Sequence, residues 1–140
     1  MSNKRRFVFD TNTIISAFLF YQSTPSEALR VALEVGEVLV SIEVLEEMAE
    51  VLHREKLDRY LERKIREEFL KALVKQAVVI ETRARIQMCR DQKDDKFLEL
   101  ALSGGAECIV SGDADLLVMN PFRGISILTP AEFLSKVSQK

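Results

Sequence analysis

Short runs of β-branched and aromatic residues alternate along this chain with longer stretches in which apolar residues recur every three or four positions. The short runs are typical of strands, and the longer stretches are typical of amphipathic helices. Alternation of the two predicts βαβ units around a parallel sheet, and therefore an α/β fold. The predicted strands are residues 6–9, 38–41, 77–80, 108–110 and 126–128.

Three helices can be predicted from local features of the sequence, two from residues at their starts and one from its apolar spacing. Thr24 and Thr129 are each followed directly by proline, and a glutamate stands three residues after each threonine. Threonine at the N-cap, proline at the first helical position and glutamate at the third are typical of a helix start. A third helix is predicted over residues 58–75, where apolar residues at helical spacing define its buried side. They are Leu61, Ile65, Phe69, Ala72 and Leu73.

The length of 140 residues and the hydrophobic content of 47% are those of one ordinary domain, and we expect residues 1–140 to form it. No apolar stretch approaches the ~20 residues of a membrane span, and the N-terminus lacks the apolar segment of a secretion signal. We therefore expect a cytoplasmic protein. Cys89 and Cys108 have no CxxC spacing, which argues against a disulfide framework or a zinc site.

Charge limits how the chain can meet a polyanion. The formal net charge is −2 and the pI is about 5.6, so the molecule as a whole offers no attractive field to nucleic acid. Any such contact must be local. Basic side chains gather in residues 4–6 and again in residues 54–66, and both segments fit either phosphate contacts or the solvated faces of helices.

Four acidic residues stand where apolar runs end or helices begin, namely Asp10, Glu47, Asp94 and Asp113. In an α/β protein such ends converge on one crevice. Two carboxylates about 5 Å apart repel by roughly 3 kcal/mol at an effective dielectric near 20, so a cluster of them requires bound cations or raised pKa values. Mg²⁺ and Mn²⁺ are hard ions that take carboxylate and water ligands and bridge to phosphate oxygens. The pattern therefore predicts a metal-dependent nuclease.

Helical geometry separates some of these acids from their neighbours. At about 100° per residue, Glu47 lies at the flank of the apolar face of its helix, while the other glutamates of that helix point to solvent. The same count puts Asp94 at the centre of a buried helix face and Asp95 about 100° away from it. Plainer roles stay open, because Asp10, Asp94 and Asp113 could each be a helix N-cap.

Taken together, four segments resemble the motifs of the PIN (PilT N-terminus) domain nucleases, and in particular the branch that contains toxin components of toxin–antitoxin pairs. Residues 7–12, FVFDTN, resemble the opening hhhDTN motif, and residues 41–48, SIEVLEEM, resemble the glutamate-bearing helix. Residues 91–98, DQKDDKFL, resemble the third, D-x-x-D segment, and residues 109–117, IVSGDADLL, resemble the fourth. The four motifs occur in order and span nearly the entire chain.

The resemblance implies a three-layer α/β/α fold with a five-stranded parallel sheet of order 3-2-1-4-5. It also implies an acidic quartet with one member from each motif, consisting of Asp10, Glu47, Asp94 and Asp113. Asn12 and Ser111 would be supporting polar groups. The roles of three neighbouring aspartates stay undecided, namely Asp91, Asp95 and Asp115, and Asp95 is the alternative third acid. Ser111 replaces the usual threonine and Gln92 a frequent proline, which leaves every carboxylate in place.

The acids and the resemblance together predict an Mg²⁺- or Mn²⁺-dependent endoribonuclease that is the toxin of a toxin–antitoxin pair. Its implied partners are single-stranded RNA, an antitoxin protein and a second copy of the chain in a homodimer. The ions would be held mainly by Asp10, Asp94 and Asp113, and Glu47 would complete the shell or orient the water. The lone histidine, His53, lies toward the exposed side of its helix and is expected to be structural.

Two other classes of protein remain open. Haloacid-dehalogenase-like phosphatases also place an aspartate at the end of the first strand, but they need a second one two residues later, where this chain has Asn12. A non-catalytic PIN-like module would hold a metal or a partner in the same acidic crevice without cutting nucleic acid. Metal binding without turnover would distinguish that module from a nuclease.

Overall fold

A parallel five-stranded sheet forms the middle layer of the computed structural model, which describes residues 4–83, 85 and 94–138. The strand order is β3-β2-β1-β4-β5, and every pair of neighbouring strands is parallel. This confirms the expected sheet. The strands are β1 (Arg5–Phe9), β2 (Gly36–Val40), β3 (Val78–Val79), β4 (Cys108–Val110) and β5 (Ser126–Leu128).

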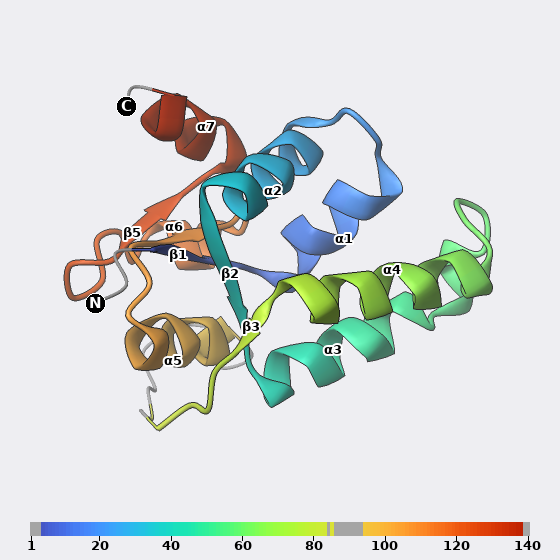
Figure 1. The fold of residues 1–140 in the computed structure, drawn as a ribbon, viewed down its shortest axis with the longest axis horizontal. Helices are drawn as coiled ribbons and strands as arrows, with labels where there is room; N and C mark the ends of the chain where they lie inside the picture. The colour runs from blue at the N-terminus through green and yellow to red at the C-terminus, as the bar shows by residue number, and fades with distance from the viewer. Residues whose placement is uncertain (1–3, 84, 86–93, 139–140) are drawn as a thin grey trace.

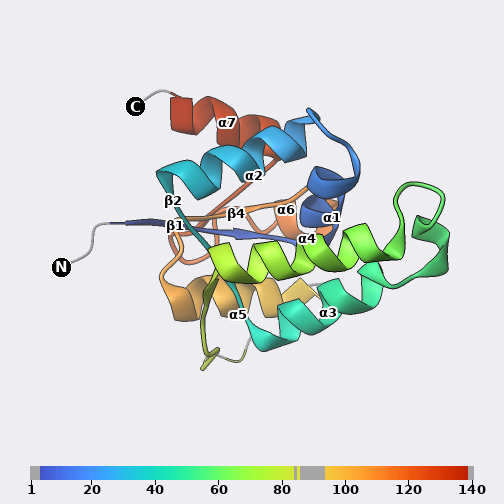
Figure 2. The same ribbon diagram turned by 45° about the vertical axis from the view of Figure 1, so that its right-hand side comes forward.

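Helices cover both faces of the sheet, as expected for three layers (Figures 1 and 2). In both views α2 and α7 lie on one side, and α3, α4 and α5 lie on the other. None of the helices in the described part of the chain has the length and apolar character that crossing a bilayer requires. The helices are α1 (Thr11–Leu19), α2 (Thr24–Val35), α3 (Ile42–Leu52), a 3-10 turn η1 (Glu55–Leu57), α4 (Arg63–Gln76), α5 (Asp95–Gly104), α6 (Ala114–Leu117) and α7 (Pro130–Ser138).

The central strand β1 shows why the sheet sits in the core. Phe7, Val8 and Phe9 are all buried, because successive strand residues face the two helical layers in turn. Phe7 and Phe9 both meet the ring of Phe133 on α7 edge to face, with ring centroids 5.1 and 5.9 Å apart. These contacts fix α7 over β1 and align the carboxyl end of the strand with its neighbours.

The two predicted helix starts differ in outcome. At α7 the Thr129 hydroxyl accepts a bond from the Glu132 backbone N–H, and the Glu132 carboxylate accepts one from the Thr129 N–H, so this capping box is confirmed. At α2 the N-cap is Ser23, whose hydroxyl accepts from the Ser26 N–H, and the prediction of Thr24 was wrong by one residue. Two adjacent hydroxyl residues compete for that position, and either can cap.

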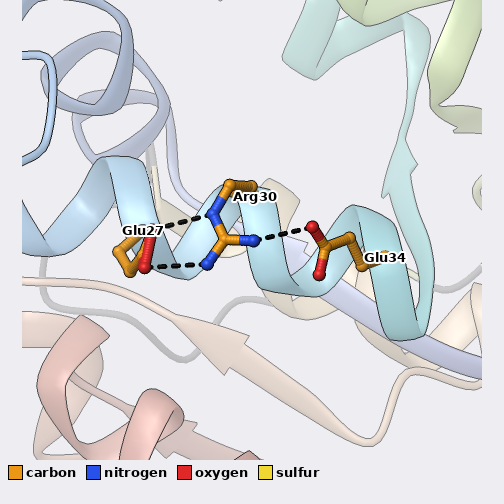
Figure 3. Close-up of polar contacts among 3 residues, drawn as sticks. All are labelled: Glu27, Arg30 and Glu34. Carbon is orange, nitrogen blue, oxygen red and sulfur yellow. Dashed lines mark hydrogen bonds and ion pairs between the residues drawn. The ribbon is translucent and has the colours of Figure 1, made fainter.

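On the solvent face of α2, one arginine bridges two glutamates (Figure 3). Arg30 makes two bonds of 2.8 Å to the Glu27 carboxylate and one of 2.6 Å to Glu34. Its guanidinium lowers the pKa of Glu27. The three side chains lie one helical turn apart, so these pairs support the helix locally and leave its other face to pack on the sheet.

The helix predicted over residues 58–75 is shorter and faces a different way. It begins at Arg63 after the separate turn η1, and Ile65 and Ala72, which were expected to be buried, are exposed. Arg66 is fully buried instead. Its guanidinium donates to the Arg54 carbonyl at 3.0 Å and to the Asp58 carboxylate. An apolar pattern alone assigns Arg66 to the surface, because the partners that allow its burial come from another segment.

Arg66→Ala tests this clamp between α3 and α4. We expect the free energy of unfolding to fall by about 2–3 kcal/mol, because a buried side chain is lost and the Arg54 carbonyl loses a donor. Chemical denaturation monitored by circular dichroism measures the change. Glu67→Ala, at an exposed position of the same helix, should stay within about 0.5 kcal/mol of the parent. Equal stability of the two variants would show that Arg66 does not hold α4 against the end of α3.

Candidate metal centre

The adjacent carboxyl ends of β1 and β4 place two motif residues side by side. Phe9 and Val110, the last residues of these strands, are paired in register. The next residue of β1, Asp10, donates its backbone N–H to the Val110 carbonyl at 3.1 Å. Ser111 follows Val110 and is fully buried. Parallel pairing therefore brings Asp10 and Ser111 together although they are far apart in the chain.

Asp10 is a buried carboxylate held by donors from two segments. Only 4% of the residue is exposed. One carboxylate oxygen accepts the Thr13 N–H at 2.8 Å, which makes Asp10 the N-cap of α1, and the other accepts the Ser111 hydroxyl. Burial raises the pKa of Asp10, the bonds from Ser111 and Thr13 partly offset this, and the nearby Asp113 charge raises it further. The N-cap interpretation and a role in an acidic site are therefore compatible for this residue.

Ser111 links Asp10 to the acid that follows β4. Its hydroxyl donates to Asp10 and accepts the Asp113 backbone N–H at 2.9 Å. Asp113 in turn accepts the Asp115 N–H at 2.9 Å and caps α6. The serine that stands where threonine was expected thus keeps the hydroxyl in use, and it fixes the position of Asp113 relative to Asp10.

Asp94 completes a group of three carboxylates. It stands at the N-cap position of α5, but its side chain makes no capping hydrogen bond, so the plainer N-cap interpretation was wrong here. One carboxylate oxygen from each of Asp94, Asp113 and Asp115 lies within 4.8 Å of the others. Asp115, which the sequence left undecided, is therefore part of the group of three carboxylates found among the described residues. Asp91 lies outside the described residues.

Burial around Asp94 differs from the expectation. Asp95 is the buried member of the pair at 5% exposure, and Asp94 is half-buried. The helical count failed because α5 is buried on most sides, Glu99 included, and so has no single apolar stripe from which to measure angles. Asp94 nevertheless lines the pocket that also contains Asp10, Glu47 and Asp113.

Glu47 lies at the flank of α3, half-buried, while the other glutamates of that helix are exposed, as the helical count predicted. Both of its carboxylate oxygens have partners. One accepts the Thr11 hydroxyl, and the other is 2.9 Å from the Lys96 ammonium group. Neither Thr11 nor Lys96 was predicted to act here. Thr11 belongs to the DTN motif, and Lys96 belongs to the third motif, directly after Asp94 and Asp95, so position in the motifs was the available signal.

The four predicted acids line one pocket of about 230 Å³. A larger hollow of about 730 Å³ shares Asp10, Asn12 and Asp113 with it, and a hollow of about 380 Å³ on the other side shares Glu47 and Arg54. Asn12 is exposed and lines the first two. The acids therefore lie in the middle of a row of adjoining hollows, which suits an extended ligand better than a small enclosed one.

The donors in this cluster are all oxygens. His53 is exposed at the end of α3, where its Nδ1 is 2.7 Å from the Ala49 carbonyl, consistent with a structural role. Cys108 is buried in β4, and burial raises the pKa of its thiol to about 12. Carboxylates without histidine or thiolate suit a hard divalent ion such as Mg²⁺ or Mn²⁺, so the residues present fit the metal that the motifs imply.

The fold and the site place this chain among α/β proteins with a group of carboxylates at the ends of the central strands. Comparison with known proteins identifies the family. A family model for the PIN domain matches residues 6–115. The chain belongs to the PIN domain family. It is 30% identical, over 143 residues, to the uncharacterized protein MJ1680 of Methanocaldococcus jannaschii, and the match covers 95% of this chain and 92% of that protein.

Two solved structures are similar in fold. PAE2754 from Pyrobaculum aerophilum has a TM-score of 0.61 at 15% identity, with 97% of this chain and 91% of that one covered. VapBC2 from Rickettsia felis, bound to a DNA fragment from its promoter, has a TM-score of 0.59 at 13% identity, with 88% and 96% covered. These similarities confirm the fold expected from the motifs.

Asp10→Asn should make the metal-free protein more stable at neutral pH. The raised pKa of Asp10 means that its ionised form destabilises the fold, so parent stability should rise as pH falls through that pKa toward the ordinary value for aspartic acid. The variant should lack this rise. Thermal melts in chelator across pH would measure it, with exposed Glu67→Gln as the control. A variant less stable than the parent at neutral pH would contradict the burial argument.

Lys96→Met should tighten metal binding. Loss of the ammonium leaves the Glu47 charge uncompensated beside the pocket, while methionine keeps the apolar stem. We expect the Kd for Mn²⁺, measured by isothermal titration calorimetry, to fall roughly three- to tenfold. Lys71→Met, which removes an exposed lysine on α4, is the matched control. Unchanged or weaker binding in the Lys96 variant would show that Lys96 does not balance charge at this site.

Proposed function

We propose that this protein is an Mg²⁺- or Mn²⁺-dependent endoribonuclease that hydrolyses phosphodiester bonds of RNA in the cytoplasm. The observation that carries the proposal is the meeting of Asp10, Glu47, Asp94 and Asp113, from four separate segments, around one pocket. Membership of the PIN domain family supports the nuclease class. The row of adjoining hollows through the acids supports a chain-like substrate.

Asp94 and Asp113 would hold the ion directly, together with Asp10 and with Asp115 close by. A bound Mg²⁺ or Mn²⁺ supplies positive charge to the phosphate and makes water a better nucleophile. The protein's part is to keep these carboxylates in place. The Ser111 hydroxyl donates to the Asp10 carboxylate and accepts the Asp113 backbone N–H, and the Asp113 carboxylate in turn accepts the Asp115 N–H.

Glu47 is better suited to orienting water than to binding the ion. Its charge is already balanced by the Lys96 ammonium group, and its other oxygen accepts the Thr11 hydroxyl, whereas the partners of Asp10, the Thr13 N–H and the Ser111 hydroxyl, are neutral. A carboxylate held from both sides has a fixed direction, which a group that orients a nucleophile needs. Thr11 and Lys96 are therefore positioning residues for Glu47 in this proposal, and Asn12 is an exposed polar neighbour of the same pocket.

We further propose that the biological role of this nuclease is that of the toxin in a toxin–antitoxin pair. It is supported by the motifs of the sequence and by the similarity of fold to VapBC2. The antitoxin would be a second protein, and the toxin itself would act as a homodimer. Growth arrest on expression, relieved by coexpression of the neighbouring gene's product, tests the role. Normal growth with a protein that cleaves RNA in vitro would retain the nuclease and reject the toxin.

Three substitutions test the nuclease. Asp10→Asn, Asp94→Asn and Asp113→Asn should each slow Mn²⁺-dependent cleavage of single-stranded RNA by on the order of 100-fold or more, because each removes a negative ligand from the ion site. Cleavage should also stop in chelator. A gel-based assay on labelled RNA measures the rates, with Glu67→Gln as the control and circular dichroism to verify folding.

The non-catalytic module predicts a different result in the same assay. If the parent binds Mn²⁺ tightly but turns over neither RNA, DNA nor small phosphate esters, the acidic pocket is a binding site and the nuclease proposal is rejected. If folded aspartate variants cleave RNA as fast as the parent, cleavage does not arise at this pocket.

A further inference from the structure

The exposed aromatic residues of this protein lie on two neighbouring turns. Among the described residues the large exposed aromatics are Phe20 and Tyr60, each 47% exposed, and Tyr21, which is 81% exposed. Phe20 and Tyr21 directly follow α1, and Tyr60 lies in the turn between η1 and α4. Exposed apolar patches on a protein surface mark sites of interaction, and aromatic side chains carry most of the contact area available to a ligand.

These two turns lie side by side although α2, β2, α3 and η1 lie between them in the sequence. Both views show the α1–α2 connection next to the α3–α4 connection (Figures 1 and 2). The rings of Phe20 and Tyr60 meet edge to face with centroids 5.7 Å apart, and the Arg59 guanidinium lies 5.4 Å from the centre of the Tyr60 ring. We call Phe20, Tyr21, Arg59 and Tyr60 the aromatic patch.

The patch is built on a rigid support. Beneath it Ile15, Leu52 and Leu57 form a second apolar cluster, separate from the main core, that joins α1 to the end of α3 and to η1. The buried Arg66 clamp holds Arg54 and Asp58 on either side of η1. Because the Phe20 and Tyr60 rings already contact each other, they lose little conformational entropy when they bind a flat ligand.

Charge near the patch favours a polyanion. Residues 53–64 contain five lysines and arginines against three acids, in a chain whose formal net charge is −2. The basic segment at residues 4–6 is already neutralised by ion pairs. Arg5 makes two bonds to Glu107, and Arg6 pairs with Glu37 at the start of β2, away from the acids at the carboxyl ends of the strands. Among the described residues, the turn that carries Tyr60 therefore keeps a local excess of basic side chains that can meet phosphates, although one of them, Arg54, also pairs with Glu50 at 3.5 Å.

The patch is connected to the acidic pocket by two elements. Helix α1 begins at Thr11, which lines the pocket, and its nine residues place Phe20 about 14 Å farther along the helix. Arg54 lines the pocket and also the adjoining hollow, and it stands at the start of the basic turn. A strand whose phosphate lies at the acids can thus reach the aromatic rings a few nucleotides away.

We propose that the aromatic patch is a stacking platform for the bases of single-stranded RNA, which holds the substrate strand beside the acidic pocket. The inference rests on the proposed nuclease function for the identity of the strand. Unstacked bases have exposed flat faces that pack on tyrosine, phenylalanine and arginine, and this recognition tolerates any sequence. Base-paired RNA keeps its bases stacked within the duplex, so the platform selects single strands.

The chain provides its own reporter for this platform. It has two tyrosines, Tyr21 and Tyr60, and no tryptophan, so tyrosine emission comes only from the patch. Titration with a short oligouridylate in chelator, where no cleavage occurs, should quench this emission. Inorganic polyphosphate of similar charge, and a blunt RNA duplex, should leave it nearly unchanged, because neither offers an open base to stack.

Variants separate the rings from the rest of the surface. Tyr21→Ala, at a highly exposed position, and the double variant Tyr21→Ala with Tyr60→Ala should weaken binding of labelled single-stranded RNA roughly 5- to 100-fold in fluorescence anisotropy. Tyr21→Phe with Tyr60→Phe keeps both rings and should bind like the parent. Val74→Ala removes an exposed apolar side chain on α4 and should also bind like the parent.

Several results would overturn the platform. They are absence of RNA binding by the folded parent, quenching by polyphosphate equal to that by oligouridylate, and unchanged RNA affinity in Tyr21→Ala. A change of molecular mass by light scattering in the alanine variants, with RNA affinity unchanged, would make the patch a contact between proteins instead. RNA binding is measured in chelator, so the platform proposal holds if the patch binds RNA, even when the parent cleaves nothing. Conversely, the nuclease proposal holds if cleavage depends on Asp94, even when Tyr21→Ala has no effect.

Discussion

A negative charge buried between two strand ends has to be held by donors from both strands, and this requirement organises the functional end of the sheet. Asp10 follows β1, yet its carboxylate depends on the Ser111 hydroxyl that follows β4 as well as on the first turn of α1. Ser111 also receives the Asp113 N–H, so one buried hydroxyl sets the relation between two acids. Phe7 and Phe9 of β1 pack against Phe133 of α7, and this packing keeps that junction in place.

The site around this junction has two halves with different electrostatics. On one side three carboxylates approach one another, which suits a divalent ion. On the other side Glu47 is balanced by Lys96 and held by Thr11, so its charge is compensated within the protein. In the proposed nuclease, this separation would assign ion binding and orientation of water to different acids. The same proposal accounts for phosphate binding by a chain with net negative charge, because a bound ion and the basic turn would supply positive charge locally.

Much of the fold could be predicted because its causes are local in sequence. Strand runs, helical periodicity and the reciprocal cap of Thr129 and Glu132 each depend on residues within one or two turns of each other. The flank position of Glu47 followed from the angle per residue on a helix with one apolar stripe. The same method failed on α5, which is buried on most sides, and on α4, where Arg66 replaces Ile65 in the interior. Burial of that arginine depends on Arg54 and Asp58, which periodicity does not detect.

The sequence by itself determined the α/β class and, through its four motifs, the PIN family and the acids to examine, since residue type and spacing suffice for these. Only the tertiary structure decided which groups touch. It put Asp115 into the tight carboxylate cluster, paired Lys96 with Glu47 and brought the two turns of the aromatic patch together. Such contacts join side chains from elements far apart in the chain, and their geometry depends on how the helices pack on the sheet, which no local pattern encodes.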